Sequence, residues 1–277
     1  MMRIAILSPI ANSIYSRLVA HLAAAEPDVE IVAIVVRTPW NVSRIKGEFR
    51  RDGARLIQKV RTKLLAREET VAPDLTDSIG AFAREVGLGS EDLKAFAARR
   101  NIPFLQAPDH NAPAALDLLR RAAPDLIAFT GGGMIRKDLL SIPRIGVMNC
   151  HAGLLPHYRG MDVVEWPAAE NRLNDPGIGL TLHLMDTGLD TGPILKQKRL
   201  DLRPGDTFAS IRSRIPQGLV TLMLEGIRGL RDGGIHPAPQ RQSDGRQYYV
   251  MHPRIRAYAE AQLSRFLEAR TSGPGNS

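Results

Sequence analysis

The chain has 277 residues, of which 44% are hydrophobic and 24% are charged. This length and composition allow a sizeable buried core and exclude both a disordered chain and a small domain stapled by disulfides. The net charge is +8, so a nucleic acid or another polyanion has to be considered as a partner. Most of that charge is local, because residues 44–67 contain nine basic and two acidic residues.

The single cysteine, Cys150, cannot form an intramolecular disulfide, and no cluster of Cys and His has the spacing of metal ligands. We therefore expect a reducing compartment and no metal site. The N-terminus does not have the pattern of a signal peptide, because the apolar run at residues 4–7 ends at Ser8 and Pro9. No apolar run approaches the roughly 20 residues that span a bilayer. The sequence predicts a cytoplasmic protein without a membrane partner.

Strand and helix patterns alternate through the first 200 residues. Short runs rich in β-branched residues predict buried strands, and apolar residues at helical spacing between capping residues predict helices. The predicted strands cover residues 4–7, 31–36, 102–106, 126–129, 145–150, 180–185 and 194–200, and the predicted helices cover residues 12–25, 90–99 with its cap, and 113–121.

This order predicts an α/β fold, a Rossmann-like, doubly wound and mostly parallel sheet whose ligands bind beyond the carboxyl ends of the strands. Apolar residues at helical spacing run through the basic segment and predict an amphipathic helical insertion at about residues 43–70. We expect a catalytic domain at residues 1–204. A helical C-terminal extension with a disordered tail is expected at residues 205–277, with its last helix over residues 253–269.

The densest group of reactive side chains lies at the end of the strand at residues 145–150. Asn149 and His151 are two positions apart, so they point to the same face of the strand. An amide that donates and an imidazole that transfers a proton suit a carbonyl whose oxygen gains negative charge. Cys150 points to the other face and is interpreted as a buried apolar side chain.

A second element, the turn at residues 188–193, places Asp190 between glycines. An aspartate near His151 would favour the imidazolium and orient its ring. Asn149, His151 and Asp190 together indicate acyl transfer without a covalent enzyme intermediate, because no Gly-x-Ser-x-Gly elbow is present. For an Asn-x-His pair taken alone, hydrogen bonding to the following loop is the structural alternative.

The two elements resemble motifs of a known family, the 10-formyltetrahydrofolate-dependent formyltransferases. Residues 149–160 are similar to its Asn-x-His-x-Ser-Leu-Leu-Pro-x-x-Arg-Gly stretch, and residues 189–194 are similar to its Leu-Asp-x-Gly-Pro-Ile turn. The resemblance covers about residues 120–210 and implies that the three side chains named above are catalytic. It is specific for the family and leaves the substrate open.

The chain departs from the family pattern at Gly153, where the family has Ser. The departure removes a hydroxyl, and with it any hydrogen bond that this group would make in the loop. His183 and Asp186 lie on or beside the strand before the second motif and are interpreted as supporting residues. We expect Asp186 to buttress the turn.

The resemblance also implies that the pterin ring of the folate lies between two loops, residues 131–135 and residues 187–192, and is bound largely by backbone groups. Glycines that follow the strand at residues 126–129 allow a close approach of this kind, although a plain strand-to-helix turn is the alternative. The expected cofactor-binding residues are Gly132, Gly133, Met134, Ile135, Thr187 and Gly188.

The family implies 10-formyltetrahydrofolate as formyl donor, and the acceptor is sought by elimination. The loop at residues 8–13 has no glycine, which disfavours the phosphate cradle of an enzyme acting on glycinamide ribonucleotide. About 70 residues follow the catalytic domain in a helical pattern, unlike the β-barrel appended to enzymes that act on methionyl-tRNA. A small-molecule amine is therefore the expected acceptor, either an amino sugar carried on a nucleotide or an amine of secondary metabolism.

Two alternatives come from other classes of protein. The same three side chains could hydrolyse 10-formyltetrahydrofolate, with water in place of the amine. The basic segment at residues 44–67 could belong to a nucleic-acid-binding protein, although Phe49 is its only aromatic residue that could stack on a base. A homodimer is left open.

Overall fold

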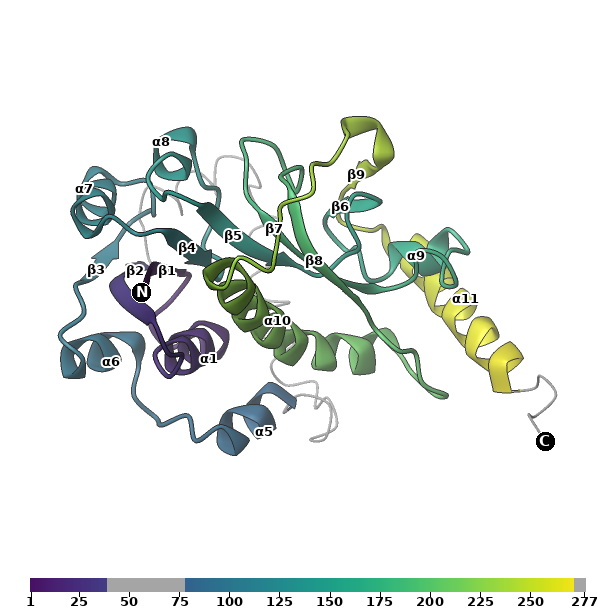
Figure 1. The fold of residues 1–277 in the computed structure, drawn as a ribbon. Helices are drawn as coiled ribbons and strands as arrows, with labels where there is room; N and C mark the ends of the chain where they lie inside the picture. Colours follow the sequence, from purple (N-terminus) through teal and green to yellow (C-terminus); the bar gives the residue numbers. More distant parts are fainter. Residues whose placement is uncertain (39–77, 272–277) are drawn as a thin grey trace, which may run out of the picture.

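The computed structural model describes residues 1–38 and 78–271, and a seven-stranded sheet forms its centre (Figure 1). The strand order is β3-β2-β1-β4-β5-β7-β8, in which β1 to β5 pair in parallel and β7 and β8 are antiparallel to their neighbours. The predicted, mostly parallel α/β fold is confirmed. The strands are β1 (Met2–Ser8), β2 (Val29–Arg37), β3 (Phe104–Ala107), β4 (Leu126–Phe129), β5 (Gly146–His151), β7 (Gly179–Leu184) and β8 (Ile194–Arg199).

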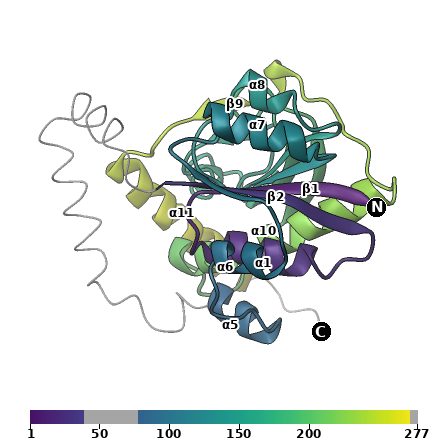
Figure 2. The ribbon, with the colours of Figure 1, turned by 90° about the vertical axis from the view of Figure 1, so that its left-hand side faces the viewer.

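Helices cover both faces of this sheet (Figures 1 and 2). In β2, residues 31–36 are all buried, as expected for a strand covered on both faces. One face carries α1 (Ile14–Ala23), α5 (Ser78–Glu85), α6 (Leu93–Arg99) and α10 (Phe208–Arg231), and the other carries α7 (Pro113–Ala122) and α8 (Lys137–Leu140). The insertion predicted at about residues 43–70 and the tail at residues 272–277 lie outside the described residues.

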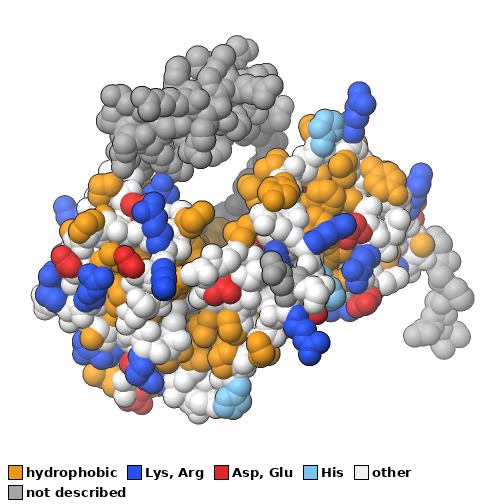
Figure 3. Space-filling model, turned by 90° about the horizontal axis from the view of Figure 1, so that it is seen from above, with side chains coloured by type: hydrophobic (Ala, Val, Ile, Leu, Met, Phe, Trp, Pro, Cys, Tyr) orange, Lys and Arg blue, Asp and Glu red, His pale blue; other side chains and the backbone are white. Residues whose placement is uncertain are grey.

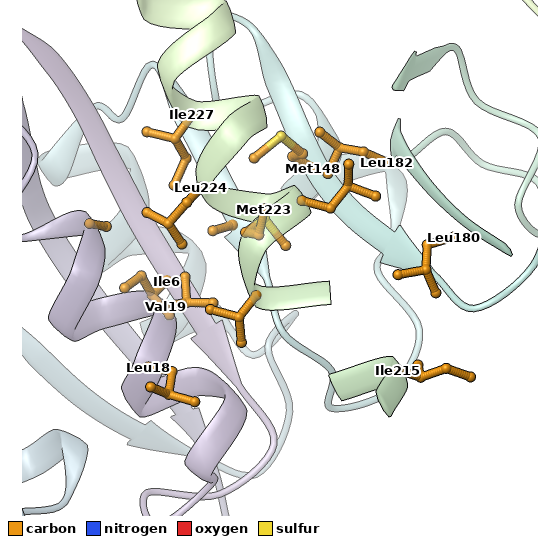
Figure 4. Packing of buried hydrophobic residues seen from close by; sticks show 14 of the residues in the cluster. Ile6, Leu18, Val19, Met148, Leu180, Leu182, Ile215, Met223, Leu224 and Ile227 are labelled. Carbon is orange, nitrogen blue, oxygen red and sulfur yellow. The ribbon is translucent and has the colours of Figure 1, made fainter. Parts of the chain in front are cut away.

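The long helix α10 packs along β5 and β7. Figure 4 shows Met223 and Ile227 of this helix among the buried side chains of Met148 and Leu182. Burial of a side chain of this size contributes about 1.5 to 3 kcal/mol. The helix follows residue 204, where we expected the catalytic domain to end, yet its buried side chains belong to the same core cluster as those of β1 and α1.

A second, two-stranded sheet was not predicted. It joins β6 (Tyr158–Gly160) to β9 (Arg246–Tyr248) in parallel. The C-terminal extension is therefore not helical throughout: between α10 and α11 (Pro253–Thr271), residues 232–252 form a strap that runs back to β6. Two short helices, α9 (Trp166–Ala169) and the 3₁₀ turn η1 (Gln242–Asp244), complete the described elements.

The two-stranded sheet is held by a cluster of aromatic rings around one carboxylate. The Tyr158 and Tyr248 rings lie 5.3 Å apart, and the Trp166 ring lies 4.9 Å from that of Tyr248. Both tyrosine hydroxyls donate to the Glu170 carboxylate, and Arg246 pairs with it as well. Aromatic packing and charge-assisted hydrogen bonds thus fasten the strap to β6.

A buried ion-pair network connects the helices around the strap. Glu165 is fully buried at the N-terminal end of α9, and its carboxylate accepts hydrogen bonds from Arg212 of α10 and Arg256 of α11. Asp162 pairs with the same two guanidinium groups. In the described ranges, no helix has both the length and the apolar character needed to cross a membrane.

Candidate active site

Strand β5 brings Asn149 and His151 to the face of the sheet opposite α10. Asn149 is paired in register with His183 of β7, and His151 is paired with Thr181. Side chains directly opposite each other in paired strands share a face, so four polar residues lie together. The expected common orientation of the first two residues is observed.

Cys150 points to the other face. Its Sγ lies 3.5 Å from the carbonyl oxygen of Leu219 on α10, to which it donates a hydrogen bond. Burial raises the pKa of the Cys150 thiol well above its ordinary value, which disfavours a reactive thiolate. Cys150 is partly buried and packs against the apolar core, so its interpretation as an unreactive, packed side chain agrees with this environment.

His151 lies between two oxygen acceptors. Its Nε2 is 2.9 Å from the carbonyl oxygen of Tyr158, and its Nδ1 is 3.5 Å from Asp190 Oδ2. A carbonyl oxygen only accepts, so Nε2 carries a hydrogen and donates it to Tyr158. Both contacts are satisfied together when Nδ1 also carries a hydrogen, as in the imidazolium. The carboxylate that we expected near His151 is therefore in place.

Asp190 is held by the backbone around it. Its Oδ2 accepts a hydrogen bond of 2.9 Å from the backbone N–H of Gly160, the last residue of β6. The side chain of Gln240, in the strap, donates to the carbonyl oxygens of Asp190 and Gly192. The backbone of Asp190 has a φ of +55°, a left-handed conformation that these contacts stabilise.

Asp186 buttresses the same turn, as expected from the sequence. Its Oδ1 accepts hydrogen bonds from the backbone N–H of Gly188 at 3.0 Å and from the Thr191 hydroxyl at 2.7 Å. The two bonds close the turn ahead of and behind Asp190. Asp186 thus acts on the shape of the loop.

His183 has a larger place in the site than the sequence indicated. It is 2% exposed, and its Nε2 lies 3.2 Å from Asn149 Nδ2 and 3.7 Å from Asp190 Oδ1. Its Nδ1 donates to the carbonyl oxygen of Leu184 at 2.9 Å. Burial lowers the pKa of His183 despite the nearby Asp190 carboxylate, which favours the neutral ring. His183 connects Asn149 to Asp190.

The expected cofactor-binding loop after β4 begins beside this group, because Phe129 of β4 is paired with Asn149. Gly131, Gly132 and Gly133 all have positive φ, between 107° and 118°. A Cβ on Gly132 would lie 2.3 Å from the Nε2 of the buried His110. Glycine is therefore required here by the packing of the protein itself, in addition to any role toward a ligand.

The remaining expected cofactor-binding residues differ in exposure. Met134 is 81% exposed, whereas Ile135 is buried against the α7 side of the sheet and can offer a ligand its backbone only. Thr187 and Gly188 are exposed in the turn before Asp190. Within residues 1–38 and 78–271, no three His, Cys, Asp or Glu side chains are grouped in a way that could hold a metal ion.

Comparison with known proteins gives one family. Residues 2–226 match the family model described as formyl transferase. The methionyl-tRNA formyltransferase of Trichlorobacter lovleyi is 35% identical over 188 residues, which are 68% of this chain and 58% of that protein. The chain spans about half the length of the curated relatives it matches.

Solved structures share the fold at lower identity. The phosphoribosylglycinamide formyltransferase from Bacillus halodurans has a TM-score of 0.52 and 16% identity, with 83% of this chain and 95% of that chain covered. A sugar N-formyltransferase from Shewanella sp FDAARGOS_354 has a TM-score of 0.54 and 15% identity, with 95% and 88% covered.

Proposed function

Because this chain belongs to the formyl transferase family, we propose that it transfers a formyl group from 10-formyltetrahydrofolate to a primary amine of a small acceptor. The observation that carries the proposal is the grouping of an amide, an imidazole and a carboxylate on one face of β5 and its neighbours. These are Asn149, His151 and Asp190, with His151 Nδ1 3.5 Å from the carboxylate. The same donors and charges suit an acyl transfer.

The three side chains divide the work of the reaction. When the amine attacks the formyl carbon, the carbonyl oxygen becomes an oxyanion. Asn149 Nδ2 donates a hydrogen bond to this oxygen, and the positive charge of the protonated His151 stabilises it. Asp190 stabilises the imidazolium. The bond from the formyl carbon to folate N10 then breaks as N10 gains the proton that the amine loses, and we propose that Asp190 assists this transfer through water.

The loops around Asn149 support a flat, partly apolar donor. Large hydrophobic side chains are exposed in three of these loops: Ile10 after β1 is 42% exposed, Met134 after β4 is 81% exposed and Leu189 after β7 is 50% exposed. Ligand pockets combine apolar side chains with a few polar groups, so apolar side chains in the loops that surround these polar residues suit an aromatic donor. Figure 3 views the α7 and α8 face, where hydrophobic side chains interrupt the charged surface.

The start of α1 supports an acceptor other than glycinamide ribonucleotide. Ser13 caps this helix, and its side chain accepts a hydrogen bond from the backbone N–H of Ser16 at 3.3 Å. One of the N–H groups that could bind a phosphate is thus already engaged. We propose a nucleotide-linked amino sugar as acceptor. Methionyl-tRNA is the second candidate, because curated relatives that are 33–38% identical carry that name.

An amine panel tests the proposal. The protein is incubated with 10-formyltetrahydrofolate and, separately, nucleotide-linked amino sugars, glycinamide ribonucleotide, methionyl-tRNA or no acceptor, while tetrahydrofolate and the formylated product are measured. We expect tetrahydrofolate release only with an amino sugar. Formate released without any acceptor would identify a hydrolase instead, and transfer to methionyl-tRNA alone would make that the acceptor.

Variants connect the activity to the site. N149A, H151A and D190A should each lower turnover about a hundredfold or more, since each removes a charge or a donor from the transition state. N174A is the control for N149A, because it replaces an asparagine by alanine at an exposed position outside the site. Wild-type turnover in all three site variants would refute the assignment.

A further inference from the structure

Gly153, the position at which this chain departs from the family motif, lies against the imidazole of His151. A Cβ built on Gly153 would be 2.9 Å from His151 Nε2, 2.9 Å from the carbonyl oxygen of Tyr158 and 2.9 Å from Val163 Cγ2. Cβ contacts shorter than 3.0 Å essentially do not occur, so one of these groups would have to move. The φ of Gly153 is outside the left-handed region, so only this lack of space excludes a side chain.

The hydrogen bond from His151 Nε2 to Tyr158 spans the space that a side chain at residue 153 would fill. We propose that Gly153 is a positioning residue: by leaving this space open, it lets the Tyr158 carbonyl hold His151 Nε2–H in both the neutral and the charged ring, so that the proton that charges the ring lies on Nδ1 and faces Asp190. This inference rests on the proposed function, in which His151 carries charge and Asp190 assists proton movement.

The contacts of both ring nitrogens of His151 agree with these different roles of Nε2 and Nδ1. With Nε2 engaged by a neutral acceptor at 2.9 Å, Nδ1 faces the Asp190 carboxylate at 3.5 Å. A donor bound to a carbonyl oxygen keeps its hydrogen in both the neutral and the charged ring, because the carbonyl cannot donate in return. The labile proton therefore lies on the side of His151 that shares its space with Asp190.

One short strand supports both partners. Tyr158 at the start of β6 accepts from His151, and Gly160 at its end donates to Asp190. The position of β6 is set in turn by β9, because Tyr248 is paired with Gly160 and stacks near Tyr158. The spacing of the histidine and the carboxylate is thus tied to three residues of one strand.

Imidazole ¹⁵N NMR tests the proposal without any substrate. The resonances of His151 are assigned by their loss in H151Q, and the pH is lowered through the titration of the ring. We expect a neutral His151 that carries its hydrogen on Nε2, and a proton that adds on Nδ1. A neutral ring with its hydrogen on Nδ1 would overturn the proposal, and this result does not depend on whether the protein transfers formyl groups.

Substitution of Gly153 gives the second measurement. G153A and G153S should both lose the Nε2–H signature, and kcat should fall at least tenfold with little change in KM for the folate, because displacement of a catalytic group by about 1 Å costs up to a hundredfold. G89A is the matched control, since a Cβ on Gly89 meets no atom within 4 Å. A G153S protein with wild-type kcat and an unchanged signature would overturn the proposal. If either variant failed to fold, the wild-type spectrum would decide.

Discussion

Asn149 Nδ2 lies 3.2 Å from His183 Nε2, across the paired strands β5 and β7. Because His183 Nδ1 donates to the carbonyl oxygen of Leu184, the Nε2 of the neutral ring has a free lone pair and accepts from the amide. Asn149 therefore turns its NH₂ group, and not its oxygen, toward His183. In the proposed mechanism the second N–H of Asn149 is left for the substrate oxygen, which would make His183 a positioning residue for the oxyanion donor.

Replacement of His183 is expected to affect turnover more than binding. H183L removes the acceptor that orients the Asn149 amide and should lower kcat about tenfold to a hundredfold, with little change in KM for the folate. H183Q can still accept through its side-chain oxygen and should retain more activity. Steady-state kinetics of both variants decide the matter: equal kcat values for H183L and the wild type would show that Asn149 is oriented without His183.

The activity should also fall on the acid side. Protonation of His183 places a hydrogen on Nε2, which then donates toward Asp190 and no longer accepts from Asn149. Burial lowers the pKa of His183, with Asp190 and Asp186 opposing the shift and His151 adding to it. The hydrogen bond from Asn149 to His183 is thus formed at neutral pH and is lost only below the ordinary histidine pKa of about 6.5. The kcat profile from pH 8 to 5 of H183Q should lack this loss; an identical acid limb in both proteins would contradict it.

His110, which packs against Gly131 and Gly132, should make the free energy of unfolding depend on pH. His110 is 1% exposed, and burial is the main cause that lowers its pKa. Between about 6.5 and this lower value the unfolded chain binds a proton that the folded chain does not. As far as His110 is concerned, the free energy of unfolding is therefore constant above about pH 6.5. Below that pH it falls, by at most about 1.4 kcal/mol per pH unit for one group.

Urea unfolding at pH 7.5, 6.5 and 5.5 measures this dependence. H110Q should flatten it, whereas H236Q, which removes an exposed histidine, is the control. The same slope in H110Q and the wild type would assign the pH dependence to other groups.

The network around Glu165 should be important for stability. E165A leaves Arg212 and Arg256 without the carboxylate that both contact at 2.7 Å. Loss of one partner of a buried ion pair costs about 3 to 5 kcal/mol, and we expect about 2 to 3 kcal/mol here because the arginine side chains are 43% and 36% exposed and water can reach them. Chemical denaturation measures the change, with E260A at an exposed position of α11 as control. A loss no larger than that of the control would contradict the expectation.

The two neighbouring glycines after β4 separate backbone strain from packing. G131A and G132A impose similar strain, because the φ values are +114° and +118°, but only the second places a Cβ against His110. The Cβ at Gly131 meets Pro9 at 3.6 Å, an ordinary contact. G132A should therefore be less stable than G131A by about 1 to 3 kcal/mol. Thermal and urea unfolding of the pair check this, and equal stabilities would show that His110 moves away at no cost.

The main sheet could be predicted because its strands are recognisable in isolation. The run at residues 31–36 is apolar at every position, which predicts a strand that is buried on both faces. The structure shows this burial in β2. The strands β6 and β9 have three residues each, and their pairing depends on contacts of Tyr158, Tyr248 and Glu170 from distant parts of the chain. A pattern this short does not distinguish a strand from a loop.

The site was predictable only where a side chain carries the signal. Strand alternation placed Asn149 and His151 on one face. The contacts that orient His151 and Asp190, however, are the carbonyl of Tyr158 and the N–H of Gly160, and every residue type has these backbone groups. His183 was underestimated because its position opposite Asn149 depends on the register of β5 with β7, which packing decides.

Because β6 pairs with β9, we expect the surroundings of His151 and Asp190 to form late during synthesis. Glu170 and Tyr248 are 78 residues apart, so the chain must be synthesised beyond residue 248 before Tyr248 can anchor β6. The central sheet can pair earlier, since its last strand ends at Arg199. Nascent chains that stop between Arg231 and Arg246 would thus contain all seven strands of the central sheet, whereas β6, which contacts His151 and Asp190, would lack its partner strand β9.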